Sequence, residues 1–573
     1  MRRLQAISIV ALTLGVISLF IEQAELSADW VILFTGAIDS SVLLLTLIEV
    51  FLELRRAPVK KTYMRLNWPS LLFVAAFVAL FIYNRASTLQ EGSRYGYLTV
   101  LIIRNLFLLL KVFTRMQKLS EFFRSVVSHP AQTIVLSFVL VIAIGTLVLM
   151  MPFTTVDRLG LGFVDALFTT TSAVCVTGLI VVDTATVFTI WGQLAIVLLI
   201  QIGGLGIMIL SFFAIFVFRQ SVSVENKLLI SYLLSENNMQ TLAGALKRII
   251  LITFAIEAAG AVLLYPAFVS SGQTAPTAIL FSIFHSVSAF CNAGFSLFST
   301  SLEAFVSNAG VNFVVCTLIV AGGLSFAVIS NSVDVMLRGV ARTLGKGGRQ
   351  ARLSVASRSV LLVNLVLIAG GTLIFYGLEH GAALSEYRLG TQYLAAFFQT
   401  VTLRTAGFNT IPLGGLSAAT YLVMMLWMFI GGASGSTAGG IKVNTVAVIA
   451  GYLASQRRGL RQTVLFRHAV QESQVAAAFT VLLFGVISVG VGATVLSLTE
   501  SFGMTEILFE SVSAFATVGL STGITGGLSL AGRVVIIILM FIGRVGPLTL
   551  FSALSGRPEK IRVAYPRADI SVG

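Results

Sequence analysis

The sequence predicts an all-α polytopic membrane protein that repeats one structural unit four times. Of its 573 residues, 57% are hydrophobic and only 11% are charged, whereas a soluble chain carries about 25% charged residues. Apolar stretches recur along the whole length, and about 20 mostly apolar residues suffice to span a bilayer. A short motif containing glycine also recurs at nearly constant spacing. These observations exclude a soluble protein with one membrane anchor.

The apolar stretches predict twelve spans. Basic Arg2 and Arg3 precede the first, Ala6–Ile21, as in a signal peptide. No small-residue cleavage site precedes the acidic stretch Glu22–Glu25, so the segment is predicted to be a retained helix. The predicted spans lie near residues 5–22, 30–54, 69–84, 97–116, 131–152, 188–218, 246–268, 312–336, 359–377, 419–450, 475–497 and 532–553.

The loop charges predict the orientation of these spans. The formal net charge is +14, which in a soluble protein would suggest a nucleic-acid partner. Here the basic residues gather in the loops after even-numbered spans, such as Arg338, Arg342 and Lys346, and the other loops are acidic or mixed. Cytoplasmic loops carry the excess of Lys and Arg. The pattern therefore predicts a cell-membrane protein with both termini cytoplasmic and no nucleic-acid partner.

Four glycine motifs lie between successive pairs of the last eight spans. Their glycines are 116, 113 and 112 residues apart, and a Phe stands ten residues before each of them: Phe168, Phe284, Phe397 and Phe509. Phe makes up only 42 of the 573 residues, so this agreement is far from chance. The motifs are FTTTSAVCVTGL (Phe168–Leu179), FHSVSAFCNAGF (Phe284–Phe295), FQTVTLRTAGF (Phe398–Phe408) and FESVSAFATVGL (Phe509–Leu520).

The span after each motif carries a second mark: IGGLG (Ile202–Gly206), AGGLS (Ala321–Ser325), IGGAS (Ile430–Ser434) and IGRVG (Ile542–Gly546). Each motif is too short to cross the bilayer and return, so it must enter and leave by the outer face. The sequence thus predicts four span–pore-helix–span repeats around one pore, plus four N-terminal transmembrane helices. The predicted divisions are 1–125 for the N-terminal four-helix transmembrane region, 126–240, 241–355 and 356–470 for repeats 1 to 3, and 471–573 for repeat 4 with a short cytoplasmic tail.

The motif chemistry suits a cation. Non-helical backbone at membrane depth survives only where it is buried in protein or lines water. The residues from Phe onwards would form a short helix whose C-terminal end carries partial negative charge. The peptides VTGL, NAGF, TAGF and TVGL could then aim carbonyl oxygens at the axis, and such carbonyl rings replace the hydration shell of K⁺. A single glycine in an apolar segment usually marks close helix packing, but four in register favour an ion path.

From about Pro130 to its C-terminus, the chain resembles the Trk/Ktr/HKT superfamily of K⁺ transporters, especially the bacterial TrkH- and KtrB-type pore subunits. The resemblance rests on the four motifs, on Gly435–Lys442 (GSTAGGIK), which looks like the intramembrane gating loop of that family, and on Gly543–Gly546 (GRVG). It implies K⁺ uptake through a selectivity filter, with K⁺ at backbone carbonyls. The filter residues would be Val176, Thr177, Gly178, Leu179, Asn292, Ala293, Gly294, Phe295, Thr405, Ala406, Gly407, Phe408, Thr517, Val518, Gly519 and Leu520.

The resemblance also implies the ion preference and the partners. In this superfamily glycine in all four filters accompanies K⁺ preference, whereas serine in the first accompanies Na⁺ transport, and here all four are glycine. Members form homodimers with one pore per subunit and pair with a cytosolic nucleotide-binding RCK-type subunit (TrkA/KtrA-like). The resemblance thus implies that K⁺ is the transported ion. The tail after Phe551 is too short to hold a nucleotide-binding domain, so the nucleotide is expected on a separate regulatory subunit, with no cofactor in this chain.

A gate is predicted beneath the filter. Arg544 occupies the column that holds glycine in the other repeats, and a charge within a span is costly and usually functional. It is interpreted as an electrostatic barrier, the alternative being a structural ion pair with an acid. The glycine-rich stretch Gly431–Gly440 is interpreted as a flexible plug, the alternative being a tightly packed, kinked helix. The predicted gate residues are Gly435, Ser436, Thr437, Ala438, Gly439, Gly440, Lys442 and Arg544, with Lys442 anchoring the cytoplasmic end.

Several other residues are open to two interpretations. Thr169, His285, Gln399 and Glu510 precede the filters and either shape the outer pore or satisfy hydrogen bonds around the pore helices. Arg404 is expected to pair with a nearby acid, Glu257 faces either a partner or water, and Cys175 and Cys291 are small buried fillers. In the fourth span Arg104, Lys111 and Arg115 do not recur at every third position. This favours packing or docking over voltage sensing for the four N-terminal spans.

Three competing functions remain. A Na⁺-permeable or unselective cation channel on the same fold is disfavoured by the first glycine. An ion-coupled solute transporter often uses inverted repeats, whereas these repeats run in one sense. A membrane enzyme lacks support, because the sequence contains no HExxH, no GxSxG and no paired carboxylates within a span.

Overall fold

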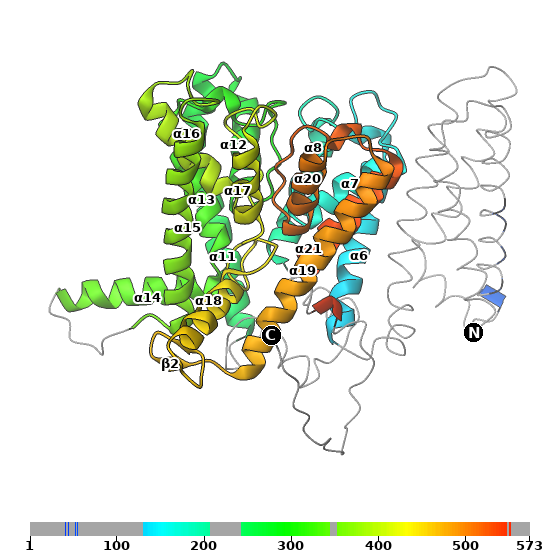
Figure 1. Cartoon of the computed structure of the whole chain (residues 1–573). Helices are drawn as coiled ribbons and strands as arrows, with labels where there is room; N and C mark the ends of the chain where they lie inside the picture. The colour runs from blue at the N-terminus through cyan, green and yellow to red at the C-terminus, as the bar shows by residue number, and fades with distance from the viewer. Residues whose placement is uncertain are drawn as a thin grey trace, which may run out of the picture.

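The computed structural model describes residues 130–206, 242–343, 352–546 and 549–551, together with six residues between Ser41 and Arg55. The predicted N-terminal region 1–125 therefore lies almost entirely outside the described residues, and so does the tail after Phe551. In the described part the regular elements are helices (Figure 1) except for one antiparallel pair of two-residue strands, β1 (Val464–Leu465) and β2 (His468–Ala469).

One order of elements occurs four times along the chain: a long helix, a short helix, a glycine-containing segment and a second helix. We call these sets one to four. Their helices are α6 (Pro130–Leu149), α7 (Phe163–Val174) and α8 (Ile190–Gly204); α11 (Leu242–Ser270), α12 (Ala275–Phe290) and α13 (Ala309–Gly323); α15 (Val355–Glu379), α16 (Leu389–Thr402) and α17 (Ala418–Met428); and α19 (Glu472–Thr499), α20 (Met504–Ala516) and α21 (Leu530–Val545). The remaining elements are α14 (Phe326–Thr343), α18 (Val443–Arg457) and the short 3-10 helices η1 (Pro152–Thr154), η3 (Glu303–Phe305) and η4 (Thr525–Gly527).

Three described helices are long and apolar enough to cross a membrane: Ile249–Ser270, Val355–Glu379 and Glu472–Thr499, with mean hydropathies of 2.0, 2.1 and 2.3. The helix pair α13 and α14 passes the same test together but is bent by 106°. Many of the remaining helices are shorter apolar segments. Long apolar helices with lipid-sized hydrophobic lengths are typical of a polytopic membrane protein.

Two predicted spans are broken rather than continuous. The predicted span 312–336 ends as α13 at Gly323, and Ser325 then begins α14 by accepting a hydrogen bond from the Val328 amide at 3.2 Å. The resulting helix α14 projects sideways from the lower end of the bundle (Figure 1). The predicted span 419–450 is divided into α17 and α18 by an irregular segment rich in glycine. Glycine and local hydrogen-bond competition explain both breaks.

The second glycine mark allows three of the short helices to pack closely against the helix that follows. A Cβ at Gly203 would overlap the carbonyl oxygen of Val174, the last residue of α7. A Cβ at Gly322 would likewise overlap the carbonyl of Phe290 at the end of α12, and one at Gly543 the carbonyl of Phe515 in α20. Small residues let two helix backbones approach closely. These glycines therefore allow the C-terminal ends of α7, α12 and α20 to press against α8, α13 and α21.

In sets three and four, a carboxylate joins the end of the first helix to the start of the last helix. Glu379, at the end of α15, accepts hydrogen bonds from the Ser417 amide at 3.0 Å and from the Thr420 hydroxyl, both at the start of α17. Glu500 follows α19 and accepts from the Ser529 amide at 3.1 Å and from the Ser529 hydroxyl, at the start of α21. A negative charge is favourable at a helix N-terminus. The same device thus joins the first and the last helix of each of these sets.

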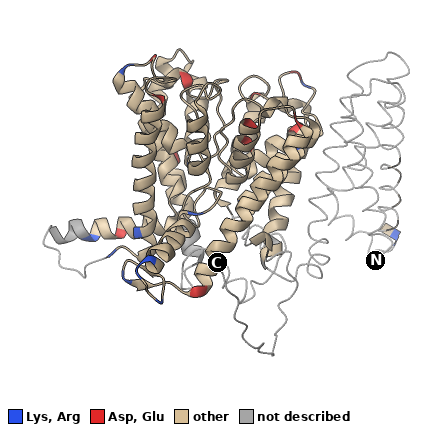
Figure 2. Cartoon of the chain, in the orientation of Figure 1, with Lys and Arg blue, Asp and Glu red and all other residues tan. Residues whose placement is uncertain are grey.

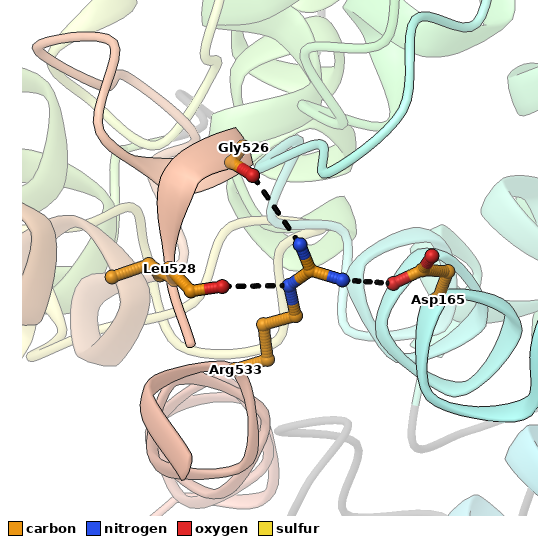
Figure 3. Close-up of polar contacts among 4 residues, drawn as sticks. All are labelled: Asp165, Gly526, Leu528 and Arg533. Carbon is orange, nitrogen blue, oxygen red and sulfur yellow. Dashed lines mark hydrogen bonds and ion pairs between the residues drawn. The ribbon is translucent and has the colours of Figure 1, made fainter. Parts of the chain in front are cut away.

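The first and last sets meet through an ion pair. Arg533 in α21 places Nη1 2.5 Å from Oδ1 of Asp165 in the first turn of α7 (Figure 3). The same guanidinium donates to the carbonyl oxygens of Leu528 at 3.1 Å and Gly526 at 3.3 Å. These two sets are separated by most of the described chain, so this contact closes the arrangement of sets into a circle.

The charged residues are unequally distributed between the two ends of the bundle. Figure 2 shows Asp and Glu mainly at the upper end, and most Lys and Arg at the lower end around α14 and α18. Arg338 belongs to α14 and Arg457 to α18. An excess of basic residues marks the cytoplasmic side of a membrane protein.

Candidate functional site

Four glycine segments follow the short helices α7, α12, α16 and α20. We define them as residues 176–179, 292–295, 405–408 and 517–520, which are the predicted filter residues. Two residues before each glycine, a residue other than glycine has positive φ: Val176 (56°), Asn292 (60°), Thr405 (66°) and Thr517 (52°). The glycines Gly178, Gly294, Gly407 and Gly519 also have positive φ, of 93°, 71°, 79° and 91°. Strained backbone of this kind clusters at functional sites.

The four glycines form a closed ring. A Cβ at Gly178 would lie 3.1 Å from the Cα of Gly294, and one at Gly294 would lie 2.8 Å from the Cα of Gly407. A Cβ at Gly407 would lie 3.3 Å from the Cα of Gly519, and one at Gly519 would lie 3.0 Å from the Cα of Gly178. The segments are therefore arranged in chain order around one axis, and backbone rather than side chains lines the ring at this level.

Carbonyl oxygens crowd the spaces between neighbouring segments. A Cβ at Gly178 would lie 2.5 Å from the carbonyl oxygen of Ala293, and a Cβ at Gly407 would lie 2.6 Å from that of Val518. A side chain at these positions would therefore collide with backbone that cannot rotate away. Both the positive φ and the close approach require glycine.

Serines fix three of the segments to their own short helices. The amide before each glycine donates to a carbonyl five residues earlier: Thr177 to Ser172 at 2.8 Å, Ala293 to Ser288 at 2.7 Å and Val518 to Ser513 at 2.8 Å. The Ser172 and Ser513 hydroxyls also accept from the amides of Gly178 and Gly519, and Ser288 donates to the Phe295 carbonyl at 2.8 Å. These serines are not among the predicted site residues, although all three stand six residues before a glycine.

The third segment is one residue shorter at this point. The Ala406 amide donates to the Thr402 carbonyl, only four residues earlier, at 2.9 Å. The fully buried Phe equivalent to Phe168, Phe284 and Phe509 is accordingly Phe398, whereas Phe397 is partly exposed. The predicted column with Phe397 is therefore displaced by one residue, because it was aligned on the glycine and the missing residue lies between helix and glycine.

A glycine-rich loop contacts the C-terminal ends of the short helices α12 and α20. We define it as residues 431–442, between α17 and α18. The Ala433 amide donates to the Gly323 carbonyl at 2.9 Å, and the Thr437 amide donates to that of Gly322 at 3.2 Å. A Cβ at Gly439 would collide with the Thr517 side chain. The loop of set three thus contacts sets two and four where their short helices end, and it is irregular backbone rather than the kinked helix of the alternative interpretation.

Arg544 joins the glycine loop to set one. Its side chain is 6% exposed; Nη1 donates to the Thr437 carbonyl and Nη2 to the Gly203 carbonyl. Among the residues that the structure describes, no ion pair with an acid is formed by Arg544, unlike the alternative interpretation. A buried guanidinium held only by carbonyl oxygens keeps its positive charge uncompensated. This charge therefore lies between the glycine loop and the end of α8, where Gly203 is located.

Lys442 and Arg404 also contact carbonyl oxygens. Lys442 Nζ donates to the Ala438 carbonyl at 2.5 Å, so this side chain fastens the glycine loop to itself rather than to an outside element. Arg404 Nη2 donates to the Gly431 carbonyl at 3.3 Å. Within the described part of the chain Arg404 has no acidic partner, so the expected ion pair is replaced by a contact with the start of the loop.

Glu257 faces other side chains of the same chain rather than water. Its Oε2 accepts from Gln201 Nε2 at 3.3 Å, and Cys291 Sγ lies 3.8 Å from its Oε1. Cys175 and Cys291 are buried and free, in keeping with the small-filler interpretation. In the described ranges, no three His, Cys, Asp or Glu side chains gather into a group that could hold a metal ion.

Comparison with known proteins gives consistent matches. The TrkH family model, described as "Cation transport protein", matches residues 101–558. The Ktr system potassium uptake protein B of Bacillus subtilis is 36% identical over 451 residues, covering 78% of this chain and 97% of that protein. The protein of the same name from Vibrio alginolyticus is 37% identical over 442 residues, covering 77% and 94%. The potassium/sodium uptake protein NtpJ of Enterococcus hirae is 36% identical over 454 residues, covering 78% and 97%.

The fold also matches a solved structure. The crystal structure of the potassium transporter TrkH from Vibrio parahaemolyticus superposes with a TM-score of 0.61, at 19% sequence identity, and covers 85% of this chain and 97% of that one. At this identity the likeness concerns the fold alone.

Proposed function

This chain belongs to the TrkH family of cation transport proteins, and we propose that it takes up K⁺ across the cell membrane as the ion-translocating subunit of a Trk/Ktr-type system. The observation that carries the proposal is the closed ring of four glycines, Gly178, Gly294, Gly407 and Gly519, at the ends of four short helices. Relatives named potassium uptake proteins at 36% and 37% identity support the choice of ion.

The proposed selectivity filter consists of the four glycine segments. Each short helix directs its C-terminal partial negative charge toward a dehydrated cation at the ring. The amides before the glycines are already engaged by the helix ends, as for Thr177 and Val518. Their carbonyl oxygens remain available, and rings of carbonyl oxygens replace the hydration shell of K⁺. K⁺ would thus bind to backbone oxygens without any charged side chain in the filter.

The proposed gate consists of Gly435, Ser436, Thr437, Ala438, Gly439, Gly440 and Lys442 of the glycine loop, together with Arg544. The loop lies across the path below the ring, and the Arg544 charge adds an electrostatic barrier to cations. Because Arg544 is bonded to both Thr437 and Gly203, opening would require these hydrogen bonds to break. A regulatory partner could supply this energy.

The wider assembly is also a proposal. We infer twelve spans with both termini cytoplasmic, an N-terminal four-helix region over 1–125, pore repeats over 126–240, 241–355 and 356–470, and a fourth repeat with a short tail over 471–573. The distribution of charge in Figure 2 supports this sidedness. We further infer a homodimer with one pore per subunit and a cytosolic nucleotide-binding RCK-type partner, since relatives are named as parts of a Ktr system.

A second candidate is a pathway that also carries Na⁺. It is favoured by the relative named potassium/sodium uptake protein, which is 36% identical. Glycine at position 178 argues for K⁺ preference, because serine at this place accompanies Na⁺ transport in the superfamily. A Gly178→Ser side chain would also meet the Ala293 carbonyl and deform the ring.

Ion flux into liposomes tests the proposed function. The purified chain is reconstituted with and without the regulatory partner, and K⁺ and Na⁺ uptake are measured for wild type and Gly178→Ser. We expect K⁺ to enter much faster than Na⁺ in the wild type, and the variant to lose this preference. Absence of flux for both ions, even with partner and nucleotide present, would contradict the proposal and favour a solute transporter.

A further inference from the structure

One polar residue stands behind each glycine segment, directly after the buried Phe of the short helix. These residues are Thr169, His285, Gln399 and Glu510, and each is at most 1% exposed. They occupy the same place in α7, α12, α16 and α20 once the one-residue difference in set three is taken into account. Their hydrogen-bond partners, however, differ between alternate sets.

His285 reaches the chain just after the second glycine segment. Its Nδ1 lies 2.8 Å from the Phe281 carbonyl oxygen, which can only accept, so Nδ1 carries the proton. Nε2 therefore accepts, from the Ser296 hydroxyl at 3.1 Å and the Leu297 amide at 3.4 Å. Ser296 stands two residues after Gly294. The neutral imidazole thus connects the short helix α12 to the outer end of its own segment.

Glu510 makes the equivalent connection in set four. Its Oε1 accepts a hydrogen bond from the Thr525 hydroxyl, whose oxygen lies 2.9 Å from Ser521 Oγ. Ser521 stands two residues after Gly519, at the same distance from its glycine as the serine bonded to His285. A different side chain therefore braces the same point of the chain.

Sets one and three lack this connection. Among the described residues, neither the Thr169 hydroxyl nor the Gln399 amide has a hydrogen-bond partner. Asn409 stands two residues after the third glycine. Its side-chain amide Nδ2 donates instead to Glu303 Oε1 at 2.7 Å and to the Ile411 carbonyl at 3.1 Å. Because the glycines follow one another in chain order around the ring, the two braced segments lie opposite each other.

We propose that His285 and Glu510 are positioning residues, a pair of opposite struts that hold the second and fourth glycine segments at the spacing that favours K⁺ over Na⁺. This inference rests on the proposed function. Carbonyl oxygens that converge on one axis repel one another, so the ring keeps its size only if its segments are held from behind. Releasing one strut lets that segment relax, and a ring that adjusts its size accommodates the smaller Na⁺ better.

The strut variants are His285→Leu and Glu510→Leu, which keep the volume and remove the hydrogen bonds. Thr169→Val and Gln399→Leu are matched controls at the same place in the unbraced sets. Glu510→Gln is the conservative variant, because its amide oxygen can still accept from Thr525 without a negative charge. All variants are compared with Gly178→Ser in the same reconstituted full-length protein.

Initial rates of K⁺ and Na⁺ uptake over a range of ion concentrations give the K⁺/Na⁺ ratio and the apparent KM for each ion. We expect each strut variant to lower the K⁺/Na⁺ ratio by roughly three- to tenfold, as for the loss of one buried hydrogen bond, mainly through the KM values. We expect Glu510→Gln to restore the ratio and the two controls to leave it within about twofold.

The outcomes separate the struts from the pore itself. If the wild type prefers K⁺ and Gly178→Ser loses this preference while both strut variants keep it, the strut proposal is wrong and the filter stands. An equal loss of K⁺ preference in the controls and the strut variants would also overturn it, since the hydrogen bonds found only in sets two and four would then not be the cause. Failure of Glu510→Gln to restore the ratio would assign the effect to charge and contradict a hydrogen-bonded strut. An unselective or inactive wild type would reject both proposals.

Discussion

The guanidinium of Arg544, in α21, donates a hydrogen bond to the backbone carbonyl of Thr437 in the glycine loop. Thr437 in turn bonds to Gly322 and, through its hydroxyl, to the Phe290 carbonyl at 3.3 Å. Since Arg544 also bonds to Gly203, one side chain connects the loop to structure from all four sets. Arg544 is therefore a buried positive charge that is hydrogen-bonded to the glycine loop, and the proposed gate assigns it the roles of barrier and latch.

Neutralising Arg544 should open the pathway. We expect Arg544→Gln to raise K⁺ flux without the regulatory partner by roughly tenfold or more, because a unit charge at about 4 Å interacts by about 4 kcal/mol at an effective dielectric of roughly 20. Liposome flux without partner measures this. Arg544→Lys retains the positive charge but lacks the forked donors, so it separates the barrier role from the latch role. K⁺ flux close to that of the wild type would support the electrostatic barrier. K⁺ flux close to that of Arg544→Gln would support the latch on the glycine loop. Unchanged flux in Arg544→Gln contradicts both roles.

Enlarging Gly439 should displace the glycine loop. A Cβ here collides with the Thr517 side chain, and the loop is irregular, whereas the Thr517 amide is held by the Ala514 carbonyl at 3.1 Å. We therefore expect Gly439→Val to raise partner-independent K⁺ flux several-fold. Gly415→Val is the control, since a Cβ there meets no atom within 4 Å. Equal flux in the two variants would show that the loop does not obstruct the path.

Substituting Gly322 should destabilise the fold. A Cβ at this position overlaps the Phe290 carbonyl at the end of α12, and backbone cannot rotate away. We expect Gly322→Ala to lower the free energy of unfolding by roughly 1–3 kcal/mol, measured as the thermal midpoint in detergent. In Gly370→Ala, where nothing lies within 4 Å, the better helix propensity of Ala should raise stability by up to about 1 kcal/mol. A midpoint for Gly322→Ala at or above wild type is the contrary result.

Breaking the Asp165–Arg533 ion pair should loosen the junction between the first and last sets (Figure 3). The two side chains are 25% and 24% exposed, so the expected coupling free energy is modest, about 1 kcal/mol. It is obtained from a double-mutant cycle with Asp165→Asn and Arg533→Gln, read from thermal unfolding. The coupling should shrink as salt is raised. A coupling of zero at low salt would mean that packing of α21 on α7 suffices to close the circle.

Glu303 should make stability depend on pH. It lies in the loop between α12 and α13, where burial raises the pKa of its carboxyl and the Asn409 hydrogen bond opposes this. With the pKa higher in the folded than in the unfolded state, the folded protein binds more protons in the window between the two values, so stability falls as pH rises through it. Glu303→Gln retains the acceptor for Asn409 and should remove this slope from the thermal midpoint between the ordinary glutamate pKa and neutral pH. An identical slope in both proteins would exclude Glu303 as its source.

The sequence by itself determined the glycine ring and the unusual arginine. Gly178, Gly294, Gly407 and Gly519 recur at fixed intervals because each must combine a positive φ with close backbone contact, and one residue type satisfies both. Arg544 stands out for a similar reason, since it replaces a small residue in a column of glycines. Local requirements of this kind restrict residue identity strongly, so they can be recognised in a single chain.

Only the tertiary structure decided which groups these residues contact. It placed Phe398 rather than Phe397 behind the third segment, gave Arg544 and Arg404 carbonyl oxygens instead of acids, and braced alternate segments through His285 and Glu510. Contacts such as Arg544 with Gly203 join residues 341 positions apart. Such pairs leave no period in the sequence, because each depends on how whole helices pack, and a buried arginine can donate to any oxygen that packing brings within reach.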